Sequence, residues 1–228
     1  MKKVGNSEIF NLIDFDLKLL KDNKVKYLIG VDEVGRGSLV GPVTAAAVLF
    51  KNNLSKPCSW CEPIYKLNDS KKISEKNRQI IDFRLNNLAY RAIGEASVAE
   101  IDAVNIYQAT LLAMHRALNQ LLEQIKINSK IDLNQVLIVI DGNMKIVNLT
   151  YQNIQLKQIA IIRGDSKSAS IASASVTAKV FRDSLITDLA KHYPQYNLAK
   201  NKGYATEFHR KAIGEFGKSE IHRKSFKI

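Results

Sequence analysis

The sequence has little cysteine, little proline and no long apolar run. Two cysteines among 228 residues cannot form a disulfide framework. The longest apolar runs, 45–50 and 136–140, are far shorter than the roughly 18 residues that a membrane-spanning helix needs. The first residues carry charge but no apolar stretch follows them, so they do not form a secretory signal. We therefore expect a cytoplasmic protein that does not enter a membrane.

The two cysteines, Cys58 and Cys61, form a C-x-x-C pair whose context is missing. A redox pair should begin a helix in a thioredoxin-like unit, and a zinc site needs two further ligands at paired spacing. Neither is visible, because the four histidines are scattered along the chain. Pro57 and Pro63 frame the pair, and we interpret it as incidental, in a surface loop.

Acidic residues are too few to balance the basic ones. The chain has 34 Lys and Arg against 22 Asp and Glu, a net charge of +12. Such an excess is typical of a protein that meets a polyanion, which puts nucleic acid first among partners. The excess is strongest in residues 200–228, with eight Lys and Arg against three Glu. A solvated basic tail is an equally good interpretation of that segment.

The length and composition indicate one domain with a sizeable core. Hydrophobic residues make up 46% of the chain and charged residues 25%, which is ordinary globular usage. No internal repeat is present, and the weak linker candidate at 51–63 reads as a loop. We expect a single domain over residues 1–228, with a sheet-and-helix core to about residue 195 and a basic C-terminal helical segment over about 196–228.

Hydrophobic periodicity predicts a mixed α/β fold. We expect strands over 27–32, 43–50, 88–98, 136–141 and 158–163, the first two as a hairpin. Helices are expected over 7–21, from a Ser74 cap to about 87, through the apolar pattern of 106–125, over 168–191 and from Thr206. Three strands in a meander followed by strands alternating with helices indicate a five-stranded mixed sheet with helices on its faces.

Acidic side chains follow three of these strands. Asp32 ends the first strand, Asp141 ends the fourth and Asp165 follows the fifth, while Glu33 comes directly after Asp32. If the three strands run parallel, all four carboxylates meet at one edge of the sheet, where open α/β sheets place their sites. Each Asp alone could be a cap or turn residue. Three of them at matching strand ends favour a functional site.

Four gathered carboxylates repel one another unless some are protonated or a cation is bound. Oxygen ligands without His or Cys suit hard ions, so we expect Mg²⁺ or Mn²⁺. Two such ions roughly 3.5–4 Å apart can activate a water and stabilise the leaving oxygen of a phosphodiester. The pattern therefore predicts metal-dependent phosphodiester hydrolysis.

A glycine-rich turn, Gly35-Arg36-Gly37, follows the first two acids. Without Cβ atoms the two glycines allow a ligand to approach the backbone closely, and Arg36 can bind a phosphate through two N–H groups. The alternative is a bare hairpin turn. The turn is not a phosphate-binding P-loop, because no G-x-x-x-x-G-K-[ST] pattern is present.

A series of motifs along nearly the whole chain then resembles one family. The motifs are Gly30-Val31-Asp32-Glu33-Val34-Gly35-Arg36-Gly37, Gly41-Pro42-Val43, Leu67-Asn68-Asp69-Ser70-Lys71-Lys72, Ile101-Asp102-Ala103-Val104-Asn105-Ile106, Ile140-Asp141-Gly142-Asn143, Gly164-Asp165-Ser166, Ile171-Ala172-Ser173-Ala174-Ser175-Val176-Thr177-Ala178-Lys179-Val180, Arg182-Asp183, Lys202-Gly203-Tyr204 and His222-Arg223-Lys224-Ser225-Phe226. In this order they resemble ribonuclease HII. The resemblance implies a ribonuclease H-like fold and two-metal cleavage of RNA joined to, or embedded in, DNA.

The resemblance also implies roles for single residues. Asp32, Glu33, Asp141 and Asp165 would be the catalytic, metal-binding carboxylates. Gly35-Arg36-Gly37 would read the ribonucleotide, and Tyr204 would lie at the RNA–DNA junction, although an ordinary surface tyrosine is the alternative. We assign Asp69 and Asp183 structural roles, since Asp183 follows Lys179 by four residues on a helix and can pair with it.

Two other functions remain open at this point. A sister ribonuclease of the third type has the same fold, but that type normally has a substrate-binding domain ahead of its catalytic domain, and only 31 residues precede Asp32. A non-catalytic protein that binds hybrid duplexes would keep the basic surface, but binding a polyanion gives no reason to gather acids. We expect a monomer without a clamp-binding C-terminal peptide, acting on RNA–DNA hybrids and ribonucleotide-containing DNA.

Overall fold

The structure is a computed structural model that describes residues 6–51 and 73–227, with residues 6–11 described as backbone only. Cys58, Cys61 and Asp69 lie outside these ranges, so the predictions made for them stay predictions. Within the described ranges, no helix combines the length and the apolar character needed to span a bilayer.

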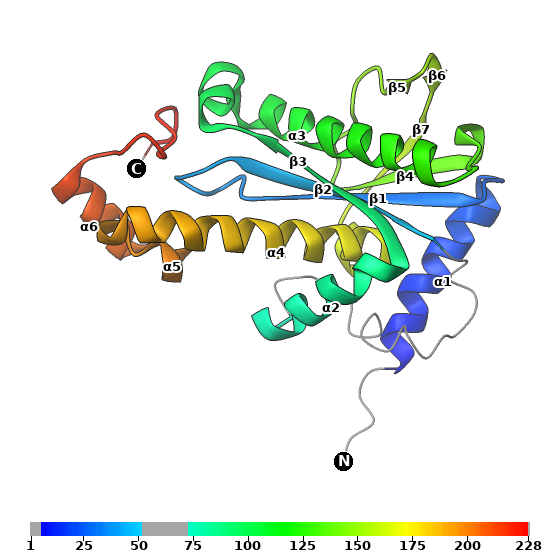
Figure 1. The fold of residues 1–228 in the computed structure, drawn as a ribbon, viewed down its shortest axis with the longest axis horizontal. Helices are drawn as coiled ribbons and strands as arrows, with labels where there is room; N and C mark the ends of the chain where they lie inside the picture. The colour runs from blue at the N-terminus through cyan, green and yellow to red at the C-terminus, as the bar shows by residue number, and fades with distance from the viewer. Residues whose placement is uncertain (1–5, 52–72, 228) are drawn as a thin grey trace.

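Five strands form one mixed sheet, in the order β3-β2-β1-β4-β7 (Figure 1). They are β1 (Tyr27–Val34), β2 (Val43–Phe50), β3 (Ala89–Ala96), β4 (Val136–Asp141) and β7 (Lys157–Ile161). The β1–β2 and β2–β3 pairs are antiparallel, while β1–β4 and β4–β7 are parallel. The predicted meander and the predicted mixed sheet are therefore confirmed. Because β1, β4 and β7 are mutually parallel, their carboxyl ends lie at one edge.

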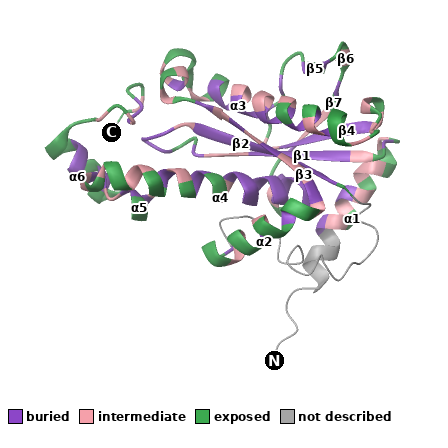
Figure 2. Cartoon of the chain, viewed as in Figure 1, coloured by how far each residue is buried: buried purple, intermediate pink, exposed green. Residues whose placement is uncertain are grey.

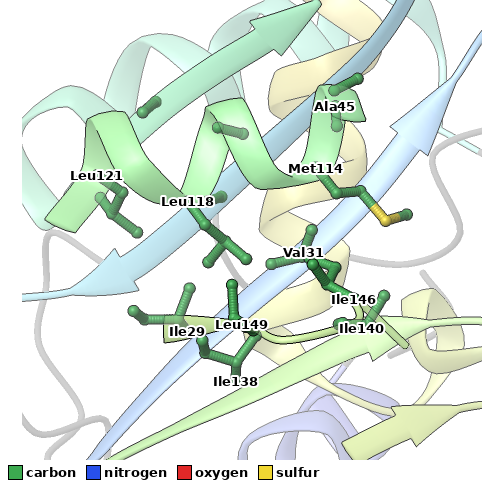
Figure 3. Packing of buried hydrophobic residues seen from close by; sticks show 14 of the residues in the cluster. Ile29, Val31, Ala45, Met114, Leu118, Leu121, Ile138, Ile140, Ile146 and Leu149 are labelled. Carbon is green, nitrogen blue, oxygen red and sulfur yellow. The ribbon is translucent and has the colours of Figure 1, made fainter. Parts of the chain in front are cut away.

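Helices cover both faces of the sheet (Figure 1). One face carries α3 (Val98–Asn128), and the other carries α1 (Asn6–Asp22), α2 (Glu75–Leu88) and α4 (Ala169–His192). On the α3 face, Met114, Leu118 and Leu121 pack against apolar side chains of β1 and β4 (Figure 3). Strands β1, β2 and β4 are buried along most of their length, whereas exposed residues lie on the outer sides of the helices and in connecting segments (Figure 2).

Two elements differ from the sequence prediction. The helix predicted from residue 106 begins at Val98, because Ser97 and Glu100 form a capping box there. It breaks at Asn105, whose positive φ of 72° departs from helical geometry and whose Oδ1 accepts the N–H groups of Tyr107 and Gln108, starting the helix again. A short hairpin, β5 (Thr150–Tyr151) with β6 (Ile154–Gln155), was not predicted, since two-residue strands leave no periodic signal.

The backbone of helix α4 packs directly against the backbone of β1 at Gly30. A Cβ built on Gly30 would stand 2.1 Å from the carbonyl carbon of Ser170, so no side chain fits between strand and helix at this point. The buried Asp16 of α1 joins the same contact, because its Oδ2 accepts the N–H of Ser170 at 2.9 Å and its hydroxyl at 2.8 Å. The small residues of α4 thus allow it to lie beside the strand that carries Asp32.

The C-terminal part is helical only at first. It contains α5 (Leu198–Asn201) and α6 (Glu207–Phe216), and Thr206 is the N-cap of α6, as predicted. Residues 217–227 contain no helix and fold back onto the rest of the chain. Asp102 of α3 fastens them by accepting the N–H of Lys224 and the N–H of Ser225, each at 2.9 Å. The basic segment is therefore not a solvated tail as a whole, although Lys224 and Lys227 are exposed.

The contact at Gly30 leads to a stability prediction. Gly30→Ala should lower the free energy of unfolding by about 3 kcal/mol or more, because the new methyl group meets backbone that cannot rotate away. Gly214→Ala on α6 is the matched control, since a Cβ there meets nothing within 4 Å and alanine favours helix by up to about 1 kcal/mol. Urea unfolding followed by circular dichroism measures both. Equal stability of the two variants would contradict the close packing.

Candidate active site

The four acids named from the sequence lie in one cleft at the carboxyl edge of the parallel strands. Asp32 lies one residue past the Val31–Ile140 pair of β1 and β4, and Asp141 is the last residue of β4. Asp165 lies in the 3-10 turn Gly164–Ser166 that follows β7. The cleft has a volume of about 480 Å³, and its lining comprises Asp32, Glu33, Val34, Gly35, Arg36, Gly37, Asp141, Asp165, Ser175, Lys179 and Tyr204.

Asp32 is the most buried of the four acids, with 5% of its surface exposed. Its Oδ1 accepts the N–H of Glu33 at 2.7 Å. Burial, followed by the charges of Glu33 and Asp141, raises the pKa of Asp32 well above its usual value, and a hydrogen bond from Ser175 opposes the rise. Burial also raises the pKa of Glu33, which Arg36 partly offsets. The cleft thus holds carboxylates that disfavour one another's charge.

Backbone N–H groups of the turn after β7 orient Asp141. The Oδ1 atom of Asp141 accepts the N–H of Gly164 at 2.6 Å and that of Asp165 at 3.3 Å. The turn brings these groups to Asp141 because Arg163 adopts the left-handed conformation, with a φ of 56°, which ends β7 two residues before the predicted boundary. Asp141 and the turn that carries Asp165 are therefore held together by hydrogen bonds.

The donor chemistry of the cleft fits a hard divalent ion. In the described part of the chain, no three His, Cys, Asp or Glu side chains stand close enough together to hold one metal ion in their present positions. The donors are nevertheless all carboxylate oxygens, which Mg²⁺ and Mn²⁺ prefer. Two of them have pKa values raised by burial and mutual repulsion, and a bound cation would relieve that repulsion. Asp32, Glu33, Asp141 and Asp165 are the side chains that would hold it.

The Gly-Arg-Gly turn forms one wall of the cleft and faces Tyr204. A Cβ on Gly37 would lie 4.0 Å from a ring carbon of Tyr204, so the ring stands directly over this glycine. Tyr204 is 37% exposed, and its backbone forms an antiparallel bridge with Ser38. Arg36 lies near Glu33, with 3.4 Å between its Nη1 and Oε1 of the carboxylate. Tyr204 and the turn therefore belong to the same surface as the acids.

Sequence reasoning did not assign Ser175 and Lys179 to the site. They stand four apart on α4 and line the cleft beside Asp32. Their spacing places them on one face of a helix, but only the contact of α4 with β1 shows that this face meets the acids. Lys179 donates to Asp183 at 2.7 Å, which confirms the predicted pair, and Arg78 lies 3.7 Å from the same carboxylate.

Comparisons with known proteins point to one family. A family model described as Ribonuclease HII matches residues 29–228. The chain is 45% identical over 207 residues to the ribonuclease HII of Wolbachia sp. subsp. Brugia malayi, covering 90% of each chain. It is 42% identical over 217 residues to that of Shewanella oneidensis, covering 95% of this chain and 93% of the relative.

Solved structures share the fold at low sequence identity. The ribonuclease H2 of Pyrococcus horikoshii OT3 aligns with a TM-score of 0.65 at 19% identity, covering 89% of this chain and 94% of that one. Bst ribonuclease HIII in complex with Mn²⁺ aligns with a TM-score of 0.61 at 16% identity, covering 84% and 70%. The likeness confirms the predicted ribonuclease H-like fold.

The buried carboxylate at position 32 should cost the metal-free protein stability. The pKa of Asp32 is higher in the folded protein than in the unfolded chain. The folded state is therefore favoured at low pH, where Asp32 is protonated, and it loses that stabilisation as the pH rises through the folded-state pKa. Asp32→Asn removes the charge, so at pH 7.5 in EDTA it should raise the urea midpoint above that of the wild type. Asp14→Asn, at an exposed position on α1, is the control and should leave the midpoint unchanged. An equal or lower midpoint for Asp32→Asn would contradict the predicted cost of burying this charge.

Proposed function

Because the chain belongs to the ribonuclease HII family, a family of metal-dependent nucleases that hydrolyse RNA in RNA–DNA hybrids, we propose that it cuts both hybrids and ribonucleotides embedded in duplex DNA. The observation that carries the proposal is the gathering of Asp32, Glu33, Asp141 and Asp165 in one cleft of a chain whose net charge is +12. The net positive charge suits the phosphate backbone of a nucleic acid. The acids suit divalent ions that act on one phosphodiester.

The four carboxylates hold Mg²⁺ or Mn²⁺ in this proposal. Two bound ions would supply a water of lowered pKa and would neutralise charge on the scissile phosphate. The chain orients the ligands: Glu33 N–H and Ser175 hold Asp32, while the N–H groups of the turn after β7 hold Asp141. Arg36 lines the same cleft and would exchange Glu33 for a substrate phosphate.

The Gly-Arg-Gly turn and Tyr204 select the bond in this proposal. Proteins distinguish RNA from DNA chiefly through the 2′-hydroxyl, which donates and accepts a hydrogen bond. Backbone groups of residues 35–37 suit this hydroxyl, since neither glycine has a side chain to block it. The Tyr204 ring over Gly37 suits stacking on the next sugar, which fits better without a hydroxyl. The cut then falls 5′ of the ribonucleotide and leaves a 5′-phosphate and a 3′-hydroxyl.

The rival functions have weaker support. A hybrid-binding protein without activity would have no use for four mutually repelling acids in its contact surface. The third type of ribonuclease H shares the fold, but the curated relatives at 45% and 42% identity are of the second type. A monomer acting in the cytoplasm remains our expectation.

Neutralising one carboxylate should abolish turnover and spare binding. Asp141→Asn, assayed with saturating Mg²⁺ on a labelled hybrid, should lower kcat more than about a hundredfold, because the metal ions supply several kcal/mol of transition-state stabilisation. Affinity for the duplex in EDTA should change less than about twofold, since few phosphate contacts are lost. Asp14→Asn is again the control. Near-normal turnover of Asp141→Asn would exclude the two-metal assignment.

Substrate preference tests the role of Tyr204. Wild type should cut a DNA duplex containing one ribonucleotide on the 5′ side of that ribonucleotide, and all-DNA duplex should resist. Tyr204→Ala should lower kcat on this duplex by tenfold or more, since base or sugar stacking on an aromatic ring contributes about 1–3 kcal/mol. Tyr107→Ala is the control, because Tyr107 is 45% exposed and is not among the residues that line the cleft. Cleavage of long hybrids alone would favour a sister ribonuclease H.

A further inference from the structure

Three distant segments are joined around the Gly-Arg-Gly turn. The N–H of Leu39 donates to the carbonyl of Gly203 at 2.8 Å, and the N–H of Arg223 donates to the carbonyl of Leu39 at 2.9 Å. The N–H of Gly41 donates to Ile221 at 2.9 Å. Residues 38–41 therefore lie between the backbone that carries Tyr204 and the C-terminal segment. Tyr204 and the C-terminal segment are thus linked to the turn through residues 38–41.

Two buried histidines, one from α6 and one from the C-terminal segment, also connect those neighbours. His209 is 0% exposed and His222 is 1% exposed, and their Nε2 atoms are 3.3 Å apart. The ring of Tyr196 packs edge-on against His222, with 4.6 Å between ring centroids. The outer nitrogens are also bonded: Nδ1 of His222 to the N–H of Ser219 at 3.0 Å, and Nδ1 of His209 to the carbonyl of Tyr204 at 3.0 Å.

The backbone partners fix the tautomer of each ring. The N–H of Ser219 can only donate, so Nδ1 of His222 accepts and the His222 proton lies on Nε2. This proton is donated to Nε2 of His209, which leaves the His209 proton on Nδ1. The carbonyl of Tyr204 can only accept, so it receives that proton. The hydrogen bonds thus run in one direction, from Ser219 through His222 and His209 to Tyr204.

Both rings must be neutral for this chain to exist. Burial, and then the neighbouring His209, lowers the pKa of His222 to about 4. Burial also lowers the pKa of His209 below its usual value. At neutral pH each ring therefore carries the single proton that the chain requires.

We propose that His209, held by His222, is a positioning residue that sets the orientation of Tyr204 at the RNA–DNA junction. The inference rests on the proposed function, because it assumes that Tyr204 contacts the substrate. The N–H of Tyr204 donates to Asn201 at 3.0 Å, and its carbonyl accepts the N–H of Thr206 at 2.8 Å as well as the imidazole of His209. These hydrogen bonds hold the Tyr204 backbone on both sides of its Cα and so fix the direction of the Cα–Cβ bond. A side chain that distinguishes one sugar from another needs a constant orientation.

Two substitutions at position 209 separate positioning from simple packing. In His209→Asn the amide nitrogen stands close to where Nδ1 stood, so it can still donate to the Tyr204 carbonyl. In His209→Gln the amide reaches the Nε2 position instead and the donor to Tyr204 is lost. Both variants leave the ring volume unfilled and disturb the histidine pair. They differ chiefly in the hydrogen bond to Tyr204.

The assay measures kcat and KM on a duplex with one ribonucleotide. His209→Gln should lower kcat about fivefold to tenfold, the effect of one lost hydrogen bond, with KM within about twofold. His209→Asn should stay within about twofold of wild type in both. The double variant Tyr204→Ala/His209→Gln should be no slower than Tyr204→Ala alone, because His209 acts through Tyr204. Equal losses in the two single variants, or multiplied losses in the double variant, would overturn the inference.

A second measurement uses the wild-type protein alone, so it depends neither on an activity assay nor on the folding of a variant. Nitrogen-15 spectra of histidine-labelled wild type should show His222 protonated on Nε2 and His209 protonated on Nδ1, and the opposite tautomers would overturn the proposal. The two hypotheses also fail differently. If wild type cuts no RNA-containing duplex, the proposed function falls and takes this inference with it. If wild type cuts and the Gln and Asn variants behave alike, the inference alone is wrong.

Discussion

The rest of this structure depends on one constraint, the repulsion among carboxylates that are held close together in a partly buried cleft. Asp32 loses most of its water and has Glu33 and Asp141 as neighbours, so its ionised form is unfavourable in the metal-free protein. The fold must therefore hold the acids in place at a cost to its own stability. The surrounding packing offsets that cost: three parallel strands bring the acids together, and α4 lies against β1 at backbone distance near Gly30. Rigid support close to a strained site is what a preorganised metal centre requires.

The sequence predicts those parts of the fold that have local signals. The strand 43–50, the Ser74 cap, the Thr206 cap and the acids at strand ends are all readable, because each depends on residues next to one another in the chain. The break at Asn105 is not readable, since a polar residue inside a helical pattern gives no sign that its φ is positive. The places of Ser175 and Lys179 also depend on which face of α4 meets β1, and that contact joins residues more than a hundred positions apart.

The support beneath the Gly-Arg-Gly turn is the part furthest from sequence prediction. Arg182 and Arg223 are almost fully buried, and within the described residues each is satisfied by backbone carbonyls of 36–42 instead of by a carboxylate ion pair. Burial lowers the pKa of Arg223 to about 9, with Arg182 as the second cause. Two basic residues that composition alone would place on a phosphate thus bind the carbonyls of residues 36–42. These two positive charges are therefore structural.

The joining of residues 38–41 to residues 219–226 has a consequence for the order of events during synthesis. The Nε atom of Arg223 donates to the carbonyl of Gly41, a residue 182 positions earlier in the chain. Contacts of such long sequence separation form late, because the loop between them must first be closed. A nascent chain that already contains Asp32 and Asp141 does not yet contain the C-terminal residues that bind the backbone next to the turn. In the proposed function, the contacts that place the turn and Tyr204 to distinguish ribose from deoxyribose are therefore among the late ones to form.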